Sequence, residues 1–282
     1  MMRRRPLEYC ATEVRNFDPD RFLTVLFAPD HARDALFTLY AFNLEIAKIR
    51  ESVSEPILAE IRFQWWRDLL EGIYSGDSSP HPIVQPLQRV VQKYALGREN
   101  FDALIKARAV DIAATPPETL DDFVQYGAKT TIPLVLLALD ILGPANETTQ
   151  SVARDAATAW AMTGLLRALP FNLWKRKNYL PTQMMAEHGV DPRAVGELRP
   201  SRELAGLIQS ISNATSAKLE AVRKERATIG REFLSPLLIA PLARQYNHHF
   251  ARSGYNIFDA AFVESPPLRA WKLTASAILR RF

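Results

Sequence analysis

Apolar residues recur at intervals of three and four along almost the whole chain, and this is the period of an amphipathic α-helix. In the segment 56–74, for example, Ile57, Ile61, Trp65 and Leu69 fall close together on a helical surface. The pattern predicts about ten helices. Their expected ranges are 20–27, 30–51, 56–74, 83–96, 99–113, 120–142, 147–169, 181–188, 202–228, 232–250 and 268–281.

Turn-forming residues separate these segments. Asp18-Pro19 is typical of a helix start, because aspartate caps the first turn and proline fits its first position. Breaks are expected at 97, 115–117, 143–144, 170, 189, 230 and 265–267, where glycine or proline occurs. Segments that alternate apolar and polar residues between turns are essentially absent, so no strands are predicted.

The same pattern indicates how the helices are organised. The segments 120–142 and 147–169 are apolar around most of their circumference, so we expect them to be central helices surrounded by the others. The chain contains no internal repeat and no low-complexity linker. We therefore predict a single all-α domain over residues 1–282, in which residues 1–15 form a mobile N-terminus.

The composition excludes several classes of protein. The chain has 282 residues but only 11 glycines, and it lacks the glycine-rich motifs that bind nucleotide phosphates. A single cysteine, Cys10, leaves no disulfide framework and no cysteine-based zinc site, as expected in a reducing compartment. The apolar run 132–139 is far shorter than the roughly 20 residues of a membrane-spanning helix. The basic start of the chain has no apolar region behind it, so a secretory signal is not expected.

The charges leave more possibilities open. The 35 basic and 31 acidic residues give a net charge of +4, and 31 carboxylates are enough to build a metal site if some of them converge. Basic clusters at 3–5, 175–177, 223–226 and 280–281 form either ordinary solvated faces or contacts with anionic lipid headgroups. Nucleic acid is disfavoured, because acidic residues interleave with the basic ones and the excess is small.

Five stretches carry recognisable motifs. Leu-Tyr-Ala-Phe at 39–42 is followed by one segment that runs from Trp-Trp-Arg-Asp-Leu at 65–69 to His-Pro at 81–82. Tyr126 begins Tyr-Gly-Ala-Lys, and Gly-Leu-Leu-Arg at 164–167 precedes Arg-Lys-Asn-Tyr-Leu-Pro at 176–181. In this order the stretches resemble the squalene/phytoene synthase family over about residues 16–230. The resemblance implies an isoprenoid-synthase-like helical bundle with a central cavity.

The resemblance also implies a chemistry. Catalysts of this family use two Asp-rich motifs on facing helices. Carboxylates three or four residues apart share a helix face, and two such faces can hold Mg²⁺ through oxygen ligands. The ions neutralise a departing diphosphate while an allylic carbocation forms in a dry cavity.

The first motif is altered in this chain. Ala47, Lys48 and Glu51 stand where the family has three aspartates, so two carboxylates are missing and one position has the opposite charge. Glu45 is a further candidate for the cavity. A carboxylate buried there would need a basic partner, because an unpaired one would protonate.

The second motif is altered as well. Ala168 replaces its leading aspartate, and Phe171 and Asn172 replace an acidic pair. We also expect Pro170 to end the helix early. From the resemblance, we therefore name no catalytic residue and no metal ligand. The expected cavity-lining residues are Tyr40, Glu45, Tyr126, Lys129, Arg167, Phe171 and Tyr179.

Other residues with chemical potential have simpler interpretations. Glu118, Asp121 and Asp122 open a predicted helix, where acidic residues favour the helix dipole, so we expect them to act as caps. Asp68 and Glu71 are expected on a solvated or ion-paired face. The five histidines are expected to be structural, Cys10 is assigned no chemistry, and the five tryptophans are expected in the core or at interfaces.

Within the family, Leu-Arg-Ala-Leu-Pro-Phe at 166–171 and Tyr-Asn-Ile-Phe-Asp at 255–259 resemble one branch. This branch contains the mitochondrial complex I assembly factor related to phytoene synthases and its bacterial relatives. No long targeting presequence precedes the motifs, so we expect a bacterial member. Its expected location is the cytoplasm, peripheral at the inner face of the inner membrane.

Three functions follow from this resemblance. The first is a non-catalytic assembly or binding factor, with respiratory complex I as the expected protein partner and no cofactor. The second is a prenyltransferase that condenses two isoprenoid diphosphates head to head at an unusual Mg²⁺ site. The third is an isoprenoid- or lipid-binding protein that kept the cavity. A cavity filled by Ile132, Val135 and Phe171 would argue against the third, because the first two replace glycines that leave room for a prenyl chain.

Overall fold

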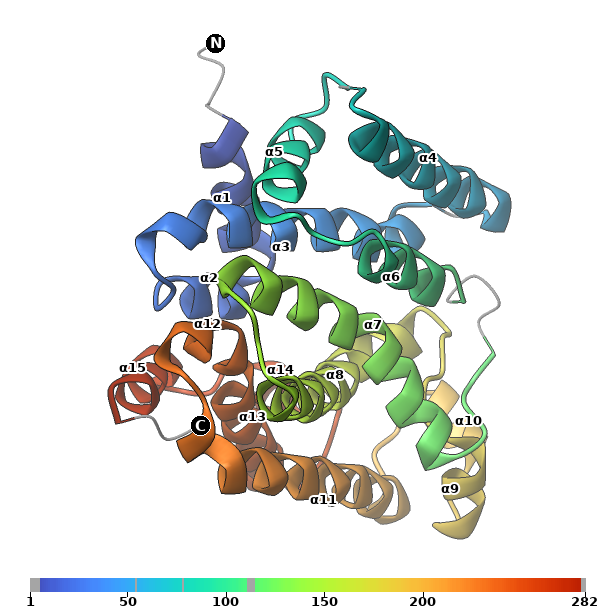
Figure 1. Ribbon diagram of the computed structural model, residues 1–282. Helices are drawn as coiled ribbons and strands as arrows, with labels where there is room; N and C mark the ends of the chain where they lie inside the picture. Colours follow the sequence, from blue (N-terminus) through green and yellow to red (C-terminus); the bar gives the residue numbers. More distant parts are fainter. Residues whose placement is uncertain (1–5, 54, 78, 111–114, 280–282) are drawn as a thin grey trace. The chain divides into compact units, whose positions relative to one another are not determined.

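The computed structural model describes residues 6–53, 55–77, 79–110 and 115–279 (Figure 1). The regular structure in these residues is helical, which confirms the all-α prediction. The α-helices are α1 (Pro6–Phe17), α2 (Pro19–Val25), α3 (Asp30–Ser52), α4 (Pro56–Ser75), α5 (Val84–Tyr94), α6 (Glu99–Ala109), α7 (Leu120–Leu142), α8 (Glu147–Trp174), α9 (Thr182–Glu187), α10 (Pro192–Gly196), α11 (Arg202–Glu225), α12 (Leu234–Leu237), α13 (Ile239–Arg252), α14 (Ala260–Val263) and α15 (Arg269–Leu279). Two 3₁₀ helices, η2 (Arg226–Thr228) and η3 (Arg231–Phe233), lie between α11 and α12.

Side-chain caps fix several helix ends where the sequence predicts them. Asp18 accepts a hydrogen bond from the backbone N–H of Arg21 at 3.1 Å and so begins α2. At the start of α7, the N–H of Thr119 donates to the Asp122 carboxylate at 2.9 Å, and the N–H of Asp122 donates to the Thr119 hydroxyl oxygen at 3.1 Å. This reciprocal pair is a capping box, and it confirms the capping role expected for Asp122.

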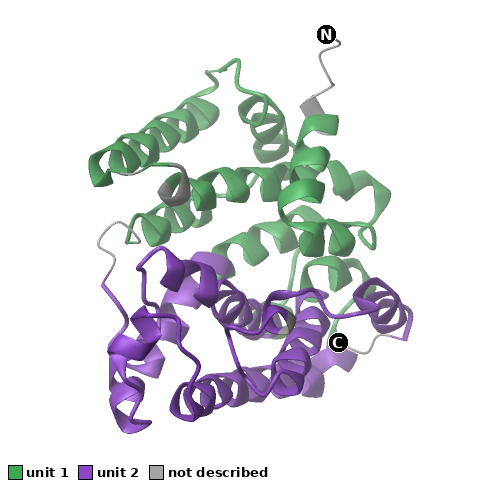
Figure 2. Cartoon of the chain, turned by 180° about the vertical axis from the view of Figure 1, so that it is seen from behind, with its two compact units in different colours: residues 1–113, 132–150, 229–237 green, residues 114–131, 151–228, 238–282 purple. Residues whose placement is uncertain are grey.

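The chain forms two compact units, each assembled from three segments (Figure 2). Unit 1 contains residues 1–113, 132–150 and 229–237, and unit 2 contains residues 114–131, 151–228 and 238–282. The helices α7 and α8 each contribute residues to both units. We describe each unit by itself, and the single domain stays a prediction.

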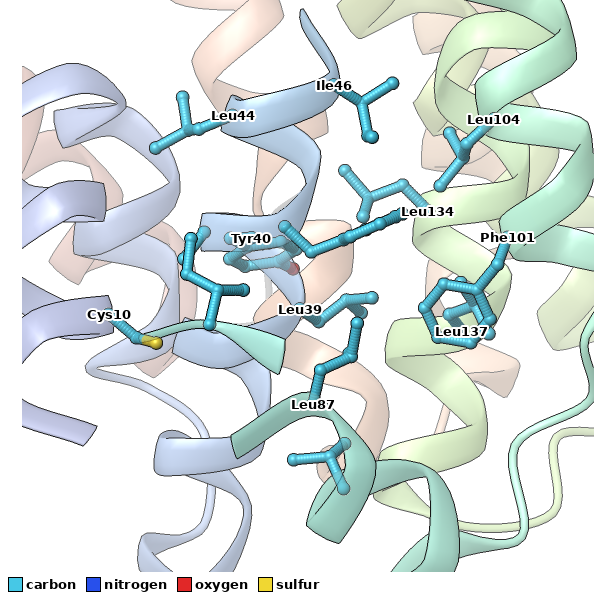
Figure 3. Packing of buried hydrophobic residues seen from close by; sticks show 14 of the residues in the cluster. Cys10, Leu39, Tyr40, Leu44, Ile46, Leu87, Phe101, Leu104, Leu134 and Leu137 are labelled. Carbon is cyan, nitrogen blue, oxygen red and sulfur yellow. The ribbon is translucent and has the colours of Figure 1, made fainter. Parts of the chain in front are cut away.

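The core of unit 1 is built around α3. Leu36, Leu39 and Phe42 of this helix have no exposed surface, and side chains from α5, α6 and the second half of α7 converge on them (Figure 3). The Phe42 ring meets the rings of Trp66 in α4 and Phe101 in α6 edge-on, with centroids 5.4 Å apart in each case. Such aromatic pairs add packing energy beyond their buried area, so they help to fix α4 and α6 against α3.

The N-terminal segment differs from the mobile terminus expected for residues 1–15. Residues 6–17 form α1, which packs against α3. The side chains of Cys10 and Val14 are fully buried in this contact, and burying apolar side chains offsets the entropy lost on ordering the helix. Burial also raises the pKa of the Cys10 thiol to about 11, so the thiolate is scarce at neutral pH. Residues 1–5 lie outside the described residues.

The core of unit 2 is formed by α11, α13 and the part of α8 that follows residue 150. Ile208 and Ile211 of α11 are fully buried. The ring of Trp160 in α8 lies 6.2 Å from the ring of Tyr246 in α13, measured between centroids. The side-chain amide of Asn247 donates to the Ser212 carbonyl at 3.0 Å and ties α13 to α11.

The prediction that α8 ends at Pro170 is wrong. The helix continues through this proline to Trp174. Proline removes one N–H from the helix, but the flanking residues Leu169 and Leu173 are buried and hold the last turn against unit 2. Three backbone hydrogen bonds of 2.8 to 3.1 Å, from the N–H groups of residues 175–177 to carbonyls at 171–173, close the end of the helix.

The predicted helix 232–250 is also broken. It forms η3, α12 and α13, with Leu238 between the last two. Pro236 and Pro241 lack backbone N–H groups, so one continuous ladder of hydrogen bonds cannot run through this segment, whereas Pro241 is tolerated in the first turn of α13. The short helices α10 and α14 were not expected, since each has too few residues to show a period. None of the described helices is both long and apolar enough to cross a membrane.

Candidate functional site

The positions of the first motif lie near the C-terminal end of α3 in unit 1. Ala47 is half-buried and presents a methyl group where a metal site would need an oxygen ligand. Lys48 forms an ion pair with Glu13 of α1 at 3.6 Å, and its ammonium lies 3.4 Å from the centroid of the Phe17 ring. Lys48 therefore links α3 to α1. The side chain of Glu51 lies outside the described residues.

Tyr40 lies two turns earlier on α3 and is almost completely buried. The guanidinium of Arg21 lies 5.6 Å from the centroid of its ring, which is a cation–π distance. Burial raises the pKa of the Tyr40 hydroxyl to about 12. Tyr40 is therefore neutral at physiological pH and is part of the packed core of unit 1.

Glu45 lines a hollow of about 440 Å³ on unit 1. Desolvation raises the pKa of its carboxyl group, and the nearby Lys48 partly opposes this shift. Three rings of its lining, those of Trp65, Trp66 and His81, have centroids 5.2 to 5.5 Å apart in edge-on contacts. Its lining residues are Glu45, Lys48, Ile49, Arg62, Trp65, Trp66 and His81.

The chemistry of this hollow does not suit a divalent cation. Among the described residues of its lining Glu45 is the one carboxylate, and the Lys48 and Arg62 side chains bring two positive charges. Burial lowers the pKa of His81, so its ring is neutral at physiological pH, but the ring contacts two indoles and not a carboxylate. The predicted structural role of His81 is consistent with these contacts.

The positions of the second motif lie on the last turns of α8 in unit 2. The Arg167 guanidinium lies 3.9 Å from the centroid of the Tyr246 ring, so its charge is directed onto α13. Ala168 and Asn172 are half-buried, and the Asn172 carbonyl accepts the N–H of Lys177 at 2.8 Å. A methyl group and an amide thus replace two carboxylates of the family pattern.

Phe171, one of the expected cavity-lining residues, lies on the last turn of α8. Its side chain is 46% exposed, and its ring stacks on the ring of Trp174 at a centroid distance of 6.3 Å. The ammonium of Lys175 lies 4.4 Å from the Phe171 centroid. The end of α8 therefore presents aromatic and basic groups to solvent.

Two tyrosines from separate motifs come together in unit 2. The rings of Tyr126 in α7 and Tyr179 stack at a centroid distance of 5.7 Å. The contact forms because the chain after Tyr179 pairs with the segment before α7, where the N–H of Thr182 donates to the Pro117 carbonyl at 3.0 Å. Lys129, one turn along α7 from Tyr126, is exposed. The sequence placed both tyrosines at the site, but their stacking depends on tertiary structure.

The Mg²⁺ ions that the family resemblance implies do not fit the residues at the motif positions. The groups described there are two methyls, an ammonium already held by Glu13 and Phe17, an aromatic ring and an amide, while the Glu51 side chain lies outside the described residues. Within the described residues, no three side chains of histidine, cysteine, aspartate or glutamate lie together in a way that could hold a metal ion. Acidic residues elsewhere have other partners, such as Glu71 with Arg98 and Asp68 with Gln64.

Two surface features were not predicted from the sequence pattern. Trp65, Trp174 and Trp271 are 44%, 67% and 76% exposed, whereas Trp66 and Trp160 are buried. An apolar stripe on α4 is formed by Ile57, Leu58, Ile61 and Trp65, all of them exposed. A period of three or four marks apolar faces but does not say which face is covered, so the sequence could not separate these residues from the core.

Comparisons with known proteins agree with the family resemblance of the motifs. The model of the squalene/phytoene synthase family matches residues 14–272. The chain is 25% identical over 261 residues to the human protein named NADH dehydrogenase (ubiquinone) complex I, assembly factor 6, and this match covers 92% of the chain and 78% of the relative. It is 23% identical over 214 residues to the phytoene synthase of Rhodobacter capsulatus, covering 76% of the chain and 63% of that enzyme.

A solved structure supports the fold. The squalene synthase of Alicyclobacillus acidocaldarius superposes with a TM-score of 0.79 at 19% sequence identity, covering 89% of the chain and 95% of that enzyme. This likeness shows that the fold is the all-α isoprenoid synthase fold. The central cavity that the resemblance implies stays a prediction.

Proposed function

Since the chain belongs to the squalene/phytoene synthase family, we propose that it keeps the scaffold of these enzymes without their catalysis and acts as an assembly factor for respiratory complex I. The observation that carries the proposal is the character of the two motif positions. Ala47 and Lys48 on α3, with Ala168 and Asn172 on α8, offer neither the charge nor the oxygen ligands that a diphosphate-bound Mg²⁺ requires.

The contacts of Lys48 strengthen this interpretation. A residue left over from a lost active site would be expected to make no structural contacts. Lys48, however, joins α3 to α1 through an ion pair and a cation–π contact. Arg167, which matches a family position, is likewise directed onto Tyr246. Both charged groups serve packing within their own unit. The protein in this proposal needs no cofactor.

The names of the relatives support complex I as the partner. The human protein that matches 92% of the chain is named as a complex I assembly factor, whereas the phytoene synthase matches 76%. We therefore assign the chain a subunit or assembly intermediate of complex I as its client. The proposed location is peripheral, at the membrane in which that complex is assembled.

An assembly factor needs an exposed face for its client, and unit 1 offers one on α4. Ile57, Leu58, Ile61 and Trp65 are each 44% to 58% exposed. Beside them lies a groove of about 780 Å³, lined by Ile57, Glu60, Ile61, Phe63, Gln64, Arg67 and Ala109. Apolar side chains bordered by charges of both signs suit a protein surface, because the charges can select a complementary partner.

The experiment is deletion of the gene, with complex I activity and the terpenoid profile measured in the same cells. The proposal expects a fall in NADH–quinone activity of the membranes with unchanged carotenoids and hopanoids. The wild-type gene should restore the activity, and a gene carrying Ile61→Asp should restore less of it. A matched control is Asp68→Asn, which changes an exposed residue two turns after Ile61 on the same side of α4 and leaves the apolar side chains intact.

The opposite result would support a head-to-head prenyltransferase. Loss of a terpenoid with intact complex I would mean that Tyr126, Tyr179 and Arg167 still serve a reaction. The stacked tyrosines are the observation that favours this second candidate, since both lie in motifs of the family. It requires Mg²⁺ ligands from positions other than those of the two motifs.

A further inference from the structure

The helix α15 exposes one apolar face while another face anchors it to unit 2. Leu273 and Ala277 are buried where α15 packs beside α13 (Figure 1). In contrast, Trp271, Ile278 and Leu279 are 76%, 72% and 57% exposed. These three side chains are apolar and large, so water around them is unfavourable unless something covers them.

The exposed residues form a stripe and are not scattered. At about 100° per residue, Trp271, Ala275, Ile278 and Leu279 fall within an arc of roughly 100° on the helix surface. The anchoring residue Leu273 lies on the other side of the helix. Single exposed apolar residues are normal on protein surfaces, but a continuous stripe marks a contact surface.

The charges of this segment have one sign. From Ser265 to the end of the chain there are four basic residues and no acidic one. Arg269 donates hydrogen bonds to the Tyr246 hydroxyl at 3.1 Å and to the Ser265 hydroxyl at 2.6 Å, so it holds α15 in place. Lys272 is exposed and borders the apolar stripe, and Arg280 and Arg281 follow the helix in the sequence.

We propose that α15 lies flat on an anionic lipid surface, with Trp271, Ile278 and Leu279 at the boundary of headgroups and acyl chains. Indole rings favour this boundary, and a lysine beside the stripe can reach the phosphates of anionic lipids. The inference deepens the peripheral location in the proposed function. It does not rest on the complex I role, because a synthase with the same helix would bind lipid equally well.

The charges favour lipid over a protein partner. The apolar stripe of α4 is bordered by the exposed Glu60, and the exposed Glu55 lies just before that helix. An anionic membrane would repel these carboxylates, whereas α15 presents none. The two stripes therefore suit different surfaces, and α4 provides a control for α15.

The test is sedimentation of the purified full chain with vesicles. Wild-type protein should bind vesicles of phosphatidylcholine mixed with phosphatidylglycerol and should bind much less to phosphatidylcholine alone. Changing two stripe residues together, Trp271→Asp and Ile278→Asp, should lower the partition coefficient at least about tenfold. Ile61→Asp on α4 should leave vesicle binding unchanged, although Ile61 is also exposed.

A second readout reports the contact itself. Brominated lipid should quench part of the tryptophan fluorescence of the wild type, and Trp271→Phe should abolish that part while vesicle binding remains. All substituted side chains are exposed, and circular dichroism with thermal melting verifies that each variant is folded.

Three results would overturn the proposal. They are absence of wild-type binding to the anionic vesicles, equal loss of binding in the Ile61→Asp variant, and undiminished binding in the stripe variant. If the stripe variant instead changes the protein from a dimer to a monomer without any vesicle binding, α15 contacts a second copy and not lipid. Failure of this test leaves complex I assembly untouched, because the deletion experiment measures it without vesicles.

Discussion

Restoring an acidic residue at position 48 should weaken the fold and should not create a metal site. In the family pattern this position is an aspartate, so Lys48→Asp returns the sequence to that pattern. In this chain the substitution removes the ion pair with Glu13 and the cation–π contact with Phe17. It also places a carboxylate near Glu13, where like charges repel.

The exposure of the Lys48 contacts determines how much stability each substitution should cost. The Lys48 and Glu13 side chains are 33% and 20% exposed, so solvent screens their 3.6 Å ion pair and its contribution is about 0.5–1 kcal/mol. Phe17 is more than half exposed, so the cation–π contact adds about 0.5–1 kcal/mol. Lys48→Met, which keeps an unbranched apolar stem, should therefore cost about 1–2 kcal/mol. Lys48→Asp should cost about 2–3 kcal/mol, because repulsion is added.

Urea and thermal unfolding measure these losses. For a chain of this size, a loss of 1 kcal/mol lowers Tm by roughly 2 °C, so we expect falls of about 2–4 °C for Lys48→Met and about 4–6 °C for Lys48→Asp. A double-mutant cycle with Glu13→Gln isolates the ion pair and should give a coupling of about 0.5–1 kcal/mol.

Adding Mg²⁺ tests whether the Lys48→Asp variant has gained a metal site. An ion that binds the folded state would raise the Tm of the variant. We expect millimolar Mg²⁺ to leave the Tm of Lys48→Asp as low as without it. A Lys48→Asp protein as stable as the wild type, or one that Mg²⁺ stabilises, would refute the reasoning that Lys48 has a structural role.

Three further predictions concern Cys10, Glu45 and two glycines. The Cys10 thiol, with its pKa raised to about 11 by burial, should react with an alkylating reagent at pH 8 at least about a hundredfold more slowly than in urea, and equal rates would contradict its burial. Burial raises the pKa of Glu45 above its unfolded value, so its ionised form opposes folding at neutral pH. Glu45→Gln should therefore be more stable than the wild type at pH 7, and the difference should vanish as the pH falls below about 4, whereas a less stable variant at pH 7 would contradict this sign. Gly164→Ala in α8 meets open space and should stabilise the fold by about 0.5–1 kcal/mol in urea unfolding. In the same assay Gly127→Val should destabilise it by about 1–3 kcal/mol, since a Cβ at 127 would lie 3.0 Å from the Cβ of Ala161; equal effects at the two glycines would contradict the close packing.

Local signals in the sequence were enough to predict much of the fold. The bounds of α7 agree with the predicted 120–142, because the capping box of Thr119 and Asp122 starts the helix and Gly143 ends it with a φ of 139°. The predicted end of α8 is wrong, because burial outweighs the local signal there. Pro170 is a strong local signal, but buried leucines on either side kept the helix intact, and local patterns contain no information on that burial.

The site was predictable as a set of positions and not as a set of contacts. The motif resemblance identified Lys48 as a charge reversal, but its partners on α1 lie in a segment that the sequence pattern did not predict to be helical. Similarly, Tyr126 and Tyr179 were both candidates, while the backbone pairing of Thr182 with Pro117 that brings them together leaves no mark in the sequence. Contacts between distant segments require the tertiary structure.

Exposure was the other quantity that the sequence could not provide. Trp65 and Trp66 are adjacent in one motif, yet one is 44% exposed and the other is in the core. The same applies to α15, where the periodic apolar residues lie on two faces and only one of them packs against unit 2. A helix with two apolar faces shows no polar stripe that would distinguish the covered face from the exposed one.

The central claim is that the chain retains the fold of its family without prenyl transfer. Its most direct test is the release of diphosphate by the purified protein from farnesyl or geranylgeranyl diphosphate, with Mg²⁺ and with a chelator in parallel. An authentic phytoene synthase serves as the positive control. We predict the same slow release in both conditions, indistinguishable from that without protein. Release that requires Mg²⁺ and yields a head-to-head prenyl product would contradict the claim.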